Sequence, residues 1–303
     1  MERRFPEELQ PLLNKWALWY IPSTAGERYD PSTTDQFIDV DCTRYRNSYR
    51  PSSYTHRSTI KTVIPRPTLW QEYLDRLMPK ESNCTLASTG QLLKQQDYFE
   101  AYLAQRLQQP SKPPLIAILL RGEHGTGKNF WMDNIMKPLL GSDNFKAVSL
   151  ADLTARFSAD LYSTLLVHIE EINDTRGKAG DKLKKLITEE STRAEAKYQQ
   201  AKVMSKYFGI VASSNVPDPV RIEANDRRYF VPVYSRHLHQ PDETKRFFAK
   251  LTEWLEEKDG LQELADYFYS LDISDFNFRF PPHTSDKEEI MEIQTSSEDK
   301  TNK

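Results

Sequence analysis

The sequence predicts an α/β protein built on a central, mostly parallel sheet. Three apolar runs indicate this sheet: LIAILL at 115–120, LLVHI at 165–169 and YFGIVAS at 207–213. Continuous apolar runs of this length are typical of parallel strands with both faces buried. Helical or polar stretches separate the runs, as in alternating α and β elements. With a fourth strand, YFVPV at 229–233, the core is expected to cover residues 114–235.

An N-terminal extension, residues 1–64, is expected to be strand-like or irregular, with two short apolar pieces, WALWYI and QFIDV. Residues 44–66 contain six Lys or Arg and no acidic residue, interleaved with Tyr and His side chains. This composition fits a nucleic-acid tether and fits a solvated basic loop equally well.

Residues 65–113 are expected to form a small helical subdomain. Apolar residues at helical spacing predict one helix at 68–77, with Thr68 as its N-cap, and a second at 91–107 that ends before Pro110. After the core, TKRFFAKLTEWLEEK and LQELADYFYSL predict a C-terminal helical region at 236–282. Residues 283–303 are polar and acidic, and we expect a disordered tail there.

The composition is that of a soluble protein, with 38% hydrophobic and 28% charged residues and a net charge of -3. The chain has no run of 18 apolar residues and opens with no cleavable leader, so we expect a cytoplasmic location and no membrane partner. Cys42 and Cys84 lack metal-site spacing, and we expect both to be free thiols.

The stretch GEHGTGKN follows the first apolar run and precedes a predicted helix, which is the context of a phosphate-binding loop. Glycines allow successive N–H groups to point at phosphate oxygens, and the helix N-terminus adds a favourable field. The lysine would reach the β- and γ-phosphates. The alternative is a glycine-rich turn between strand and helix. The predicted nucleotide-binding residues are Gly122, Glu123, His124, Gly125, Thr126, Gly127, Lys128 and Asn129.

Asn129 stands where such a loop usually has Ser or Thr. A hydroxyl there would bind magnesium, whereas Asn offers a carbonyl oxygen, also a hard ligand, or leaves the position to water. We therefore predict that ATP binding is retained, that magnesium binding is weaker or rearranged, and that Asn129 is a candidate metal ligand.

Two adjacent carboxylates, Glu170 and Glu171, end the second apolar run, 42 residues beyond Lys128. We predict that Glu170 holds magnesium and that Glu171 orients and polarises the attacking water. The alternative is a solvated turn.

Polar residues also follow the third run and precede the fourth. Asn215 is predicted to hold the attacking water against the γ-phosphate, although a turn residue before VPDP is the alternative. Arg227 and Arg228 are predicted to serve a nucleotide held by their own chain or by a neighbouring subunit. A surface ion pair is the alternative for the two arginines.

In combination these motifs resemble a superfamily 3 helicase, a branch of the AAA+ ATPases. The loop, the acidic pair and the strand ending in Asn are packed into residues 122–215. The resemblance is closest to the helicase domain of phage primase-polymerase and poxvirus-type replication proteins, and it extends over residues 70–282. It includes KLKKLITEES, SSNVPDPVRIEANDRRYFVP and LADYFYSLDISDFNFRFPPHT.

The resemblance implies an AAA+-type P-loop core in a homo-oligomeric, hexameric ring that hydrolyses ATP between subunits and translocates on single-stranded DNA. RAEAKYQQAKVMSKYF matches the hairpin that lines the pore in this family. It places Lys197 and Tyr198 near the tip, and Lys202 or Lys206 is the alternative for the phosphate-contacting role. Priming would then come from a separate primase or polymerase, or from a part of the gene product outside this sequence, and a phage-encoded member would act in the host cytoplasm.

Two alternative functions would also use the predicted nucleotide site. One is an AAA+ ATPase that remodels or loads DNA-bound proteins without unwinding. The other is a nucleotide-binding DNA clamp with weak hydrolysis, to which Asn129 would point.

Overall fold

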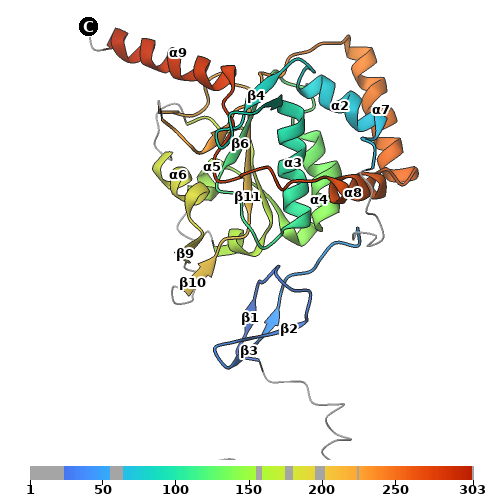
Figure 1. The fold of residues 1–303 in the computed structure, drawn as a ribbon, viewed down its shortest axis with the longest axis vertical. Coiled ribbons are helices and arrows are strands. Elements are labelled where there is room, and N and C mark those ends of the chain that lie inside the picture. The colour runs from blue at the N-terminus through green and yellow to red at the C-terminus, as the bar shows by residue number, and fades with distance from the viewer. Residues whose placement is uncertain are drawn as a thin grey trace, which may run out of the picture.

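The computed structural model describes residues 24–54, 64–154, 159–174, 180–194, 202–223 and 225–301. Its centre is a five-stranded sheet in the order β12-β6-β11-β8-β7, of which β6 and β11 are labelled in Figure 1. Every neighbouring pair in this sheet is parallel, so the predicted α/β class with a mostly parallel sheet is confirmed. The strands are β6 (Ala117–Arg121), β7 (Phe145–Val148), β8 (Leu166–Ile169), β11 (Gly209–Ser214) and β12 (Tyr229–Phe230).

Strand β11 lies in the middle of the sheet, with β6 on one side and β8 on the other. Its residue Ala212 pairs with Leu119 of β6 and with Ile169 of β8. All residues of these three strands are buried. Parallel pairing brings the carboxyl ends of the three strands to one edge of the sheet, where their following loops meet.

Helices cover both faces of the sheet. Alternate residues of β6 divide between the two layers: Ile118 and Leu120 belong to one hydrophobic cluster, and Leu119 to the other. The first cluster includes α2 (Thr68–Leu77), α3 (Gln95–Gln108), the π-helix η3 (Met132–Met136), α4 (Lys137–Leu140), α7 (Pro241–Glu257) and α8 (Gly260–Ser270). The second includes α5 (Leu150–Thr154), η5 (Ala159–Ser163), α6 (Gly180–Thr188) and part of α9 (Ser285–Thr301).

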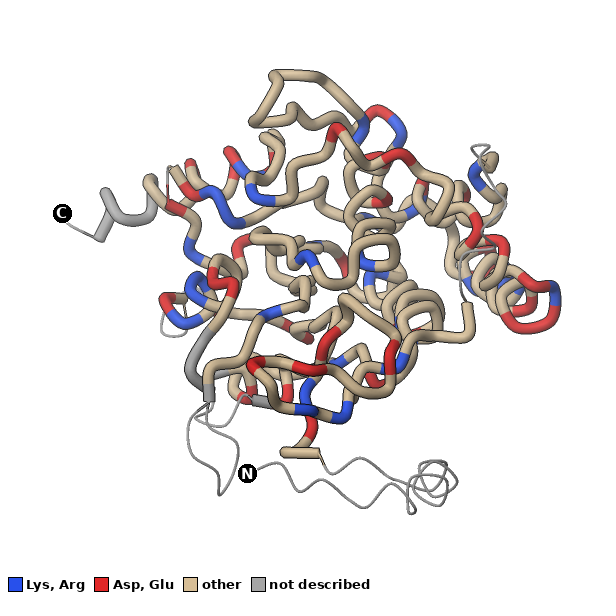
Figure 2. Tube along the Cα trace, turned by 60° about the horizontal axis from the view of Figure 1, so that its bottom comes forward, with Lys and Arg blue, Asp and Glu red and all other residues tan. Residues whose placement is uncertain are grey.

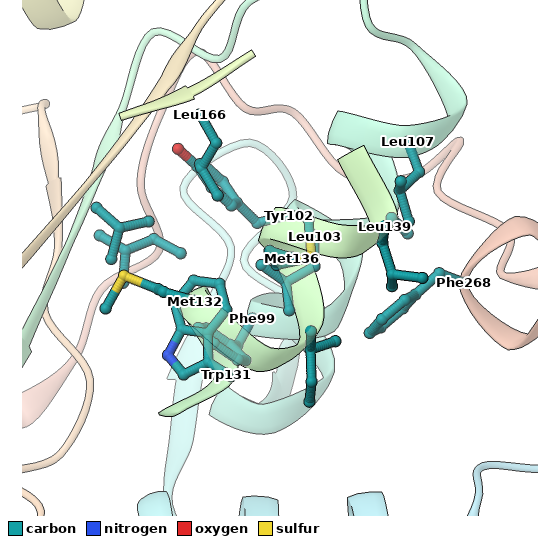
Figure 3. Close-up of a cluster of buried hydrophobic side chains, with 14 of the residues drawn as sticks. Phe99, Tyr102, Leu103, Leu107, Trp131, Met132, Met136, Leu139, Leu166 and Phe268 are labelled. Atoms are coloured by element: carbon teal, nitrogen blue, oxygen red, sulfur yellow. The ribbon is translucent and has the colours of Figure 1, made fainter. Parts of the chain in front are cut away.

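The first cluster holds the helix after the predicted phosphate loop against α3. Phe99 of α3 packs edge-on to Trp131 with ring centroids 5.0 Å apart, and Met132, Met136 and Phe268 lie in the same cluster (Figure 3). Burying large aromatic and apolar side chains stabilises a fold by roughly 1.5–3 kcal/mol each. The loop is therefore anchored at its C-terminal end in the core.

A small three-stranded sheet precedes the core, with strands β1 (Glu27–Arg28), β2 (Phe37–Val40) and β3 (Thr43–Asn47) in the order β1-β3-β2. Its contact with the core includes Tyr29, whose hydroxyl donates a hydrogen bond of 2.7 Å to Asn144 Oδ1 next to β7. QFIDV is thus largely strand β2. WALWYI and His56 lie outside the described residues.

Arginines of the basic segment 44–66 pair with acids elsewhere in the chain. Arg44 pairs with Asp39 across the hairpin, and the buried Glu100 accepts a hydrogen bond from Arg66. The described part of the segment is therefore partly neutralised.

Three boundary predictions are wrong for local reasons. The second helix begins at Gln95, because Leu92–Lys94 forms β5 and pairs with β4 (Asn83–Thr85). Strand β12 is only Tyr229–Phe230, and Pro232 has no N–H for a ladder. Pro67, and not Thr68, is the N-cap of α2, whose range Thr68–Leu77 is the one predicted.

The predicted disordered tail is also wrong. Residues Ser285–Thr301 form helix α9, and Ile290 on it is completely buried in the second cluster. The short elements that remain are η4 (Ser142–Asn144) and the antiparallel pair β9 (Ser191–Ala194) and β10 (Lys202–Ser205). Within the described ranges, the helices are too short or too polar to cross a membrane. The predicted domain boundaries remain predictions.

Candidate functional site

A pocket of about 230 Å³ opens at the carboxyl ends of β6, β8 and β11. Residues from three separate segments line it: His124, Gly125, Gly127, Lys128, Asn129, Glu171, Ser213, Ser214 and Asn215. The structure therefore brings together the glycine-rich loop, one member of the acidic pair and the Asn at the end of the third apolar run. Their roles there remain predictions.

Glycines fix the path of the loop. Gly125 and Gly127 have φ values of 78° and 91°, in the left-handed region that side chains rarely adopt. At Gly122 a Cβ atom would lie 2.5 Å from the Ser235 carbonyl oxygen, so only glycine fits there. The predicted helix follows directly, beginning at Phe130 and passing into η3 and α4.

Lys128 points back into the loop. Its Nζ donates hydrogen bonds to the carbonyl oxygens of Gly122 and Glu123, at 2.9 and 2.7 Å, and to Asn215 Oδ1 at 2.8 Å. Burial lowers the pKa of Lys128, and the nearby Glu123 opposes this shift. Because desolvation disfavours its charge, an incoming anion would gain from pairing with this ammonium.

The two acids differ in placement. Glu171 lines the pocket, and its backbone has a φ of 48°, a strained value for a residue with a side chain. Its neighbour Glu170 is exposed, lies outside the pocket lining, and donates its backbone N–H to Val148 O at the end of β7. Of the pair, Glu171 is thus the one placed to act on a bound group.

Asn129 has a buried side-chain oxygen, Oδ1, without a hydrogen-bond partner in the described structure. An unsatisfied buried acceptor is costly, and a bound cation or donor would satisfy it. No cluster of three or more His, Cys, Asp or Glu among the described residues could hold a metal by itself. Magnesium often completes its coordination with phosphate oxygens and water. Asn129 Oδ1 therefore fits a magnesium site whose other ligands are phosphate oxygens and water molecules.

Arg227 and Arg228 do not reach this pocket. Arg228 precedes Tyr229, which pairs with Ala117, the first residue of β6, so both arginines lie at the amino edge of the sheet. The length of β6 separates this edge from the pocket by about 16 Å at ~3.3 Å per residue. Arg228 Nη1 pairs with the buried Asp226 carboxylate at 2.5 Å, whereas Arg227 is exposed.

The predicted DNA-contacting segment is described only in part. Lys197 and Tyr198 lie outside the described residues, between β9 and β10, and Lys202 is the first residue of β10, paired with Ala194.

Lys206 requires a correction. Its side chain is 2% exposed, and Nζ donates hydrogen bonds to the carbonyl oxygens of Ile187 and Pro114. Burial, reinforced by Arg106, lowers its pKa to about 7. The prediction that Lys206 contacts DNA is wrong, because its ammonium lies inside the fold.

Side chains remote in sequence also hold the loop. The ring Nε2 of His237 donates to His124 O at 2.6 Å, and its backbone N–H donates to Glu123 Oε2 at 2.8 Å. Tyr73 donates its hydroxyl to Gly127 O at 2.7 Å. Sequence reasoning missed these residues because no spacing rule links them to the loop.

The pocket floor has one more feature that the sequence did not reveal. His168 Nε2 lies 2.9 Å from Ser213 Oγ, a pocket-lining hydroxyl, and burial lowers the pKa of His168 to about 4. The imidazole is therefore neutral near pH 7.

Comparisons with known proteins give a consistent result. The model of a family of unknown function, DUF5906, matches residues 120–228. The chain is 25% identical over 215 residues to a DNA primase-polymerase of Nitratiruptor phage NrS-1, which covers 70% of this chain and 27% of that protein. The chain thus matches only about a quarter of this relative's length.

Solved structures of the NrS-1 C terminal region share the fold. One apo structure aligns with a TM-score of 0.69 at 19% identity, covering 95% of this chain and 66% of that chain. An A form apo structure aligns with a TM-score of 0.68 at 19% identity and the same coverage.

Proposed function

We propose that this chain is an ATP-dependent DNA helicase of the superfamily 3, AAA+ type, acting in phage or mobile-element DNA replication. The observation that carries the proposal is the shared pocket of Lys128, Glu171 and Asn215. Similarity to a phage DNA primase-polymerase supports the replication context.

Each pocket residue would have a separate role in ATP hydrolysis. The loop's N–H groups would cradle the triphosphate, and the Lys128 ammonium would exchange its carbonyl acceptors for β- and γ-phosphate oxygens. Glu171 would accept a proton from the attacking water, and the Asn215 amide would hold that water in line. Asn129 Oδ1 would hold magnesium directly and the exposed Glu170 would hold it through water, and the ion would supply positive charge beside the phosphates.

The placement of the arginines supports an oligomer. Since Arg228 lies at the amino edge of the sheet, it cannot serve the pocket of its own chain. We propose that it reaches the pocket of an adjacent copy in a ring, as the resemblance implies. Hydrolysis would then require two copies of the chain.

Single-stranded DNA is the proposed track. Basic and acidic residues are interspersed along the trace in Figure 2, so binding would depend on a local element. The β9–β10 hairpin, with Lys197, Tyr198 and Lys202 in or beside its connection, is that element. A lysine next to an aromatic ring binds phosphate and base without reading sequence.

ATP turnover by the full chain, with and without single-stranded DNA, tests the proposal. We expect DNA to stimulate turnover, and Lys128→Ala and Glu171→Gln each to lower it about 100-fold or more. The Glu171→Gln variant should still bind ATP. Turnover that is unchanged in both variants would refute an ATPase at this pocket.

Strand displacement on a forked duplex separates the helicase from its alternatives. Hydrolysis without displacement would favour remodelling or loading of DNA-bound proteins. Nucleotide-dependent DNA retention without hydrolysis would favour a clamp.

A further inference from the structure

The first turn of helix α9 contacts the residue that directly precedes the phosphate loop. Asp286 Oδ1 accepts a hydrogen bond of 2.6 Å from Arg121 Nη2 and one of 2.9 Å from the backbone N–H of Tyr234. Arg121 is the last residue of β6 and is 3% exposed. The carboxylate thus joins three elements behind the pocket: α9, the end of β6 and the segment after β12.

Arg121 carries this contact to the loop after β11. Its other amino group, Nη1, donates a hydrogen bond of 2.7 Å to Pro217 O, two residues beyond Asn215. A guanidinium is planar, so fixing one amino group on a carboxylate also fixes the direction of the other. The hydrogen bond to Asp286 therefore fixes the orientation of the Arg121 guanidinium, and with it the position of the Pro217 carbonyl oxygen.

Tyr234 makes the second connection. Its hydroxyl donates to Asn215 O at 3.3 Å, and the guanidinium groups of Arg121 and Arg236 lie 5.8 and 5.4 Å from its ring centroid. Because Asp286 also binds the backbone N–H of Tyr234, one carboxylate acts on this segment at two points. The backbone there is held at Asn215 O and at Pro217 O.

We propose that Asp286 is a positioning residue that sets the place of the Asn215 amide through Arg121 and Tyr234. This inference rests on the proposed ATPase function. Asp286 does not line the pocket and would not touch the nucleotide. Its loss should leave the loop and its phosphate contacts intact while moving the group that holds the attacking water.

Steady-state kinetics and nucleotide binding of Asp286→Asn test this role. We expect kcat to fall about tenfold, while KM and the Kd for a non-hydrolysable ATP analogue stay within about twofold of wild type. Asp286→Glu keeps the carboxylate and should recover part of the lost kcat. Tyr234→Phe removes only the hydroxyl and should lower kcat several-fold with the same unchanged affinity.

Gln294→Ala is the matched control for docking of α9. Its amide binds Asp218 and the backbone of Val220 and Ile222, and within the described residues none of these hydrogen bonds reaches Arg121 or Tyr234. We expect Gln294→Ala to lower thermal stability and to keep wild-type kcat. If Asp286→Asn fails to fold, Tyr234→Phe decides the question.

Failure of the positioning role and failure of the proposed ATPase function give different results in these experiments. If the Lys128→Ala variant hydrolyses ATP at the wild-type rate, the proposed ATPase function itself is refuted. Turnover that depends on Lys128 but is unchanged in Asp286→Asn, or in Tyr234→Phe if the former does not fold, would overturn the positioning role. The positioning role would also be overturned if Asp286→Asn and Gln294→Ala both lower kcat in proportion to their loss of thermal stability.

Discussion

The Lys128 ammonium donates a hydrogen bond of 2.8 Å to Asn215 Oδ1, and this contact joins the loop after β6 to the end of β11. The two side chains come from segments 87 residues apart in the sequence. Under the proposed function, a triphosphate would compete with Asn215 for the ammonium. The amide released in this exchange would be free to bind the attacking water, so nucleotide entry and water placement would be coupled.

Substitutions of Asn215 should separate affinity from turnover. Asn215→Ala removes the amide and should lower ATP turnover about 100-fold with little change in affinity, as for loss of one oriented hydrogen-bonding group. Asn215→Asp places a carboxylate against Lys128 and should weaken ATP binding about tenfold, since the new ion pair competes with phosphate. Titration with a fluorescent ATP analogue and steady-state kinetics check both results. Wild-type turnover in Asn215→Ala would contradict the assigned role.

Gly127→Ala should abolish ATP binding by the loop, whereas Gly90→Ala, at another glycine with a positive φ, should not. A Cβ atom at Gly127 would lie 2.4 Å from Phe248 Cζ, in addition to strain from its φ of +91°. Gly90 has a φ of +73° with nothing within 4 Å, so Gly90→Ala tests the backbone strain alone. That strain costs roughly 1–2 kcal/mol. Thermal denaturation and ATP titration should show loss of binding in Gly127→Ala and retained binding in Gly90→Ala, and equal behaviour would contradict the steric argument.

Much of the site was predictable because its residues follow buried strands. Continuous apolar runs located β6, β8 and β11, and the residues after them therefore meet at one edge of the sheet. Strand β7 was missed because its FKAV sequence is short and only Phe145 in it is fully buried. Helix α9 was missed because its stability depends on distant partners such as Arg121, which local sequence does not reveal. Lys206 was misassigned because a sequence shows a charge but not its burial.

Magnesium dependence should reveal the role of Asn129. If its orphan Oδ1 serves the metal, Asn129→Ala should raise the magnesium concentration for half-maximal turnover roughly tenfold, and Asn129→Thr should restore or lower it. Turnover measured against free magnesium checks this. Asn134→Ala, on the helix that follows Asn129 and with its amide donating to Phe130 O, is the control and should not shift the curve. An unshifted curve in Asn129→Ala would exclude this oxygen as a ligand.

Arg228→Ala should abolish hydrolysis while leaving ATP affinity largely intact, because the arginine lies at the amino edge of its own sheet. Mixing this variant with Lys128→Ala subunits should restore some turnover, since some interfaces then combine an intact pocket with an intact arginine. Arg227→Ala provides a neighbouring control, and full activity there would single out Arg228. Absence of rescue at every mixing ratio would argue against action between subunits.

Lys206 should make stability depend on pH in the alkaline range. Its folded pKa of about 7 lies below the ordinary value of 10.5, so between these values the folded state binds fewer protons than the unfolded state. The free energy of unfolding therefore rises with pH in this window, by about 2 kcal/mol from pH 7 to pH 9 for this group. Chemical denaturation of wild type and Lys206→Met at both pH values isolates the contribution, which the variant should lack. The exposed Lys185, substituted as Lys185→Met, should leave the wild-type pH dependence in place. An equal rise in Lys206→Met and wild type would mean that Lys206 is protonated inside the fold, and its carbonyl contacts would then be those of a buried cation.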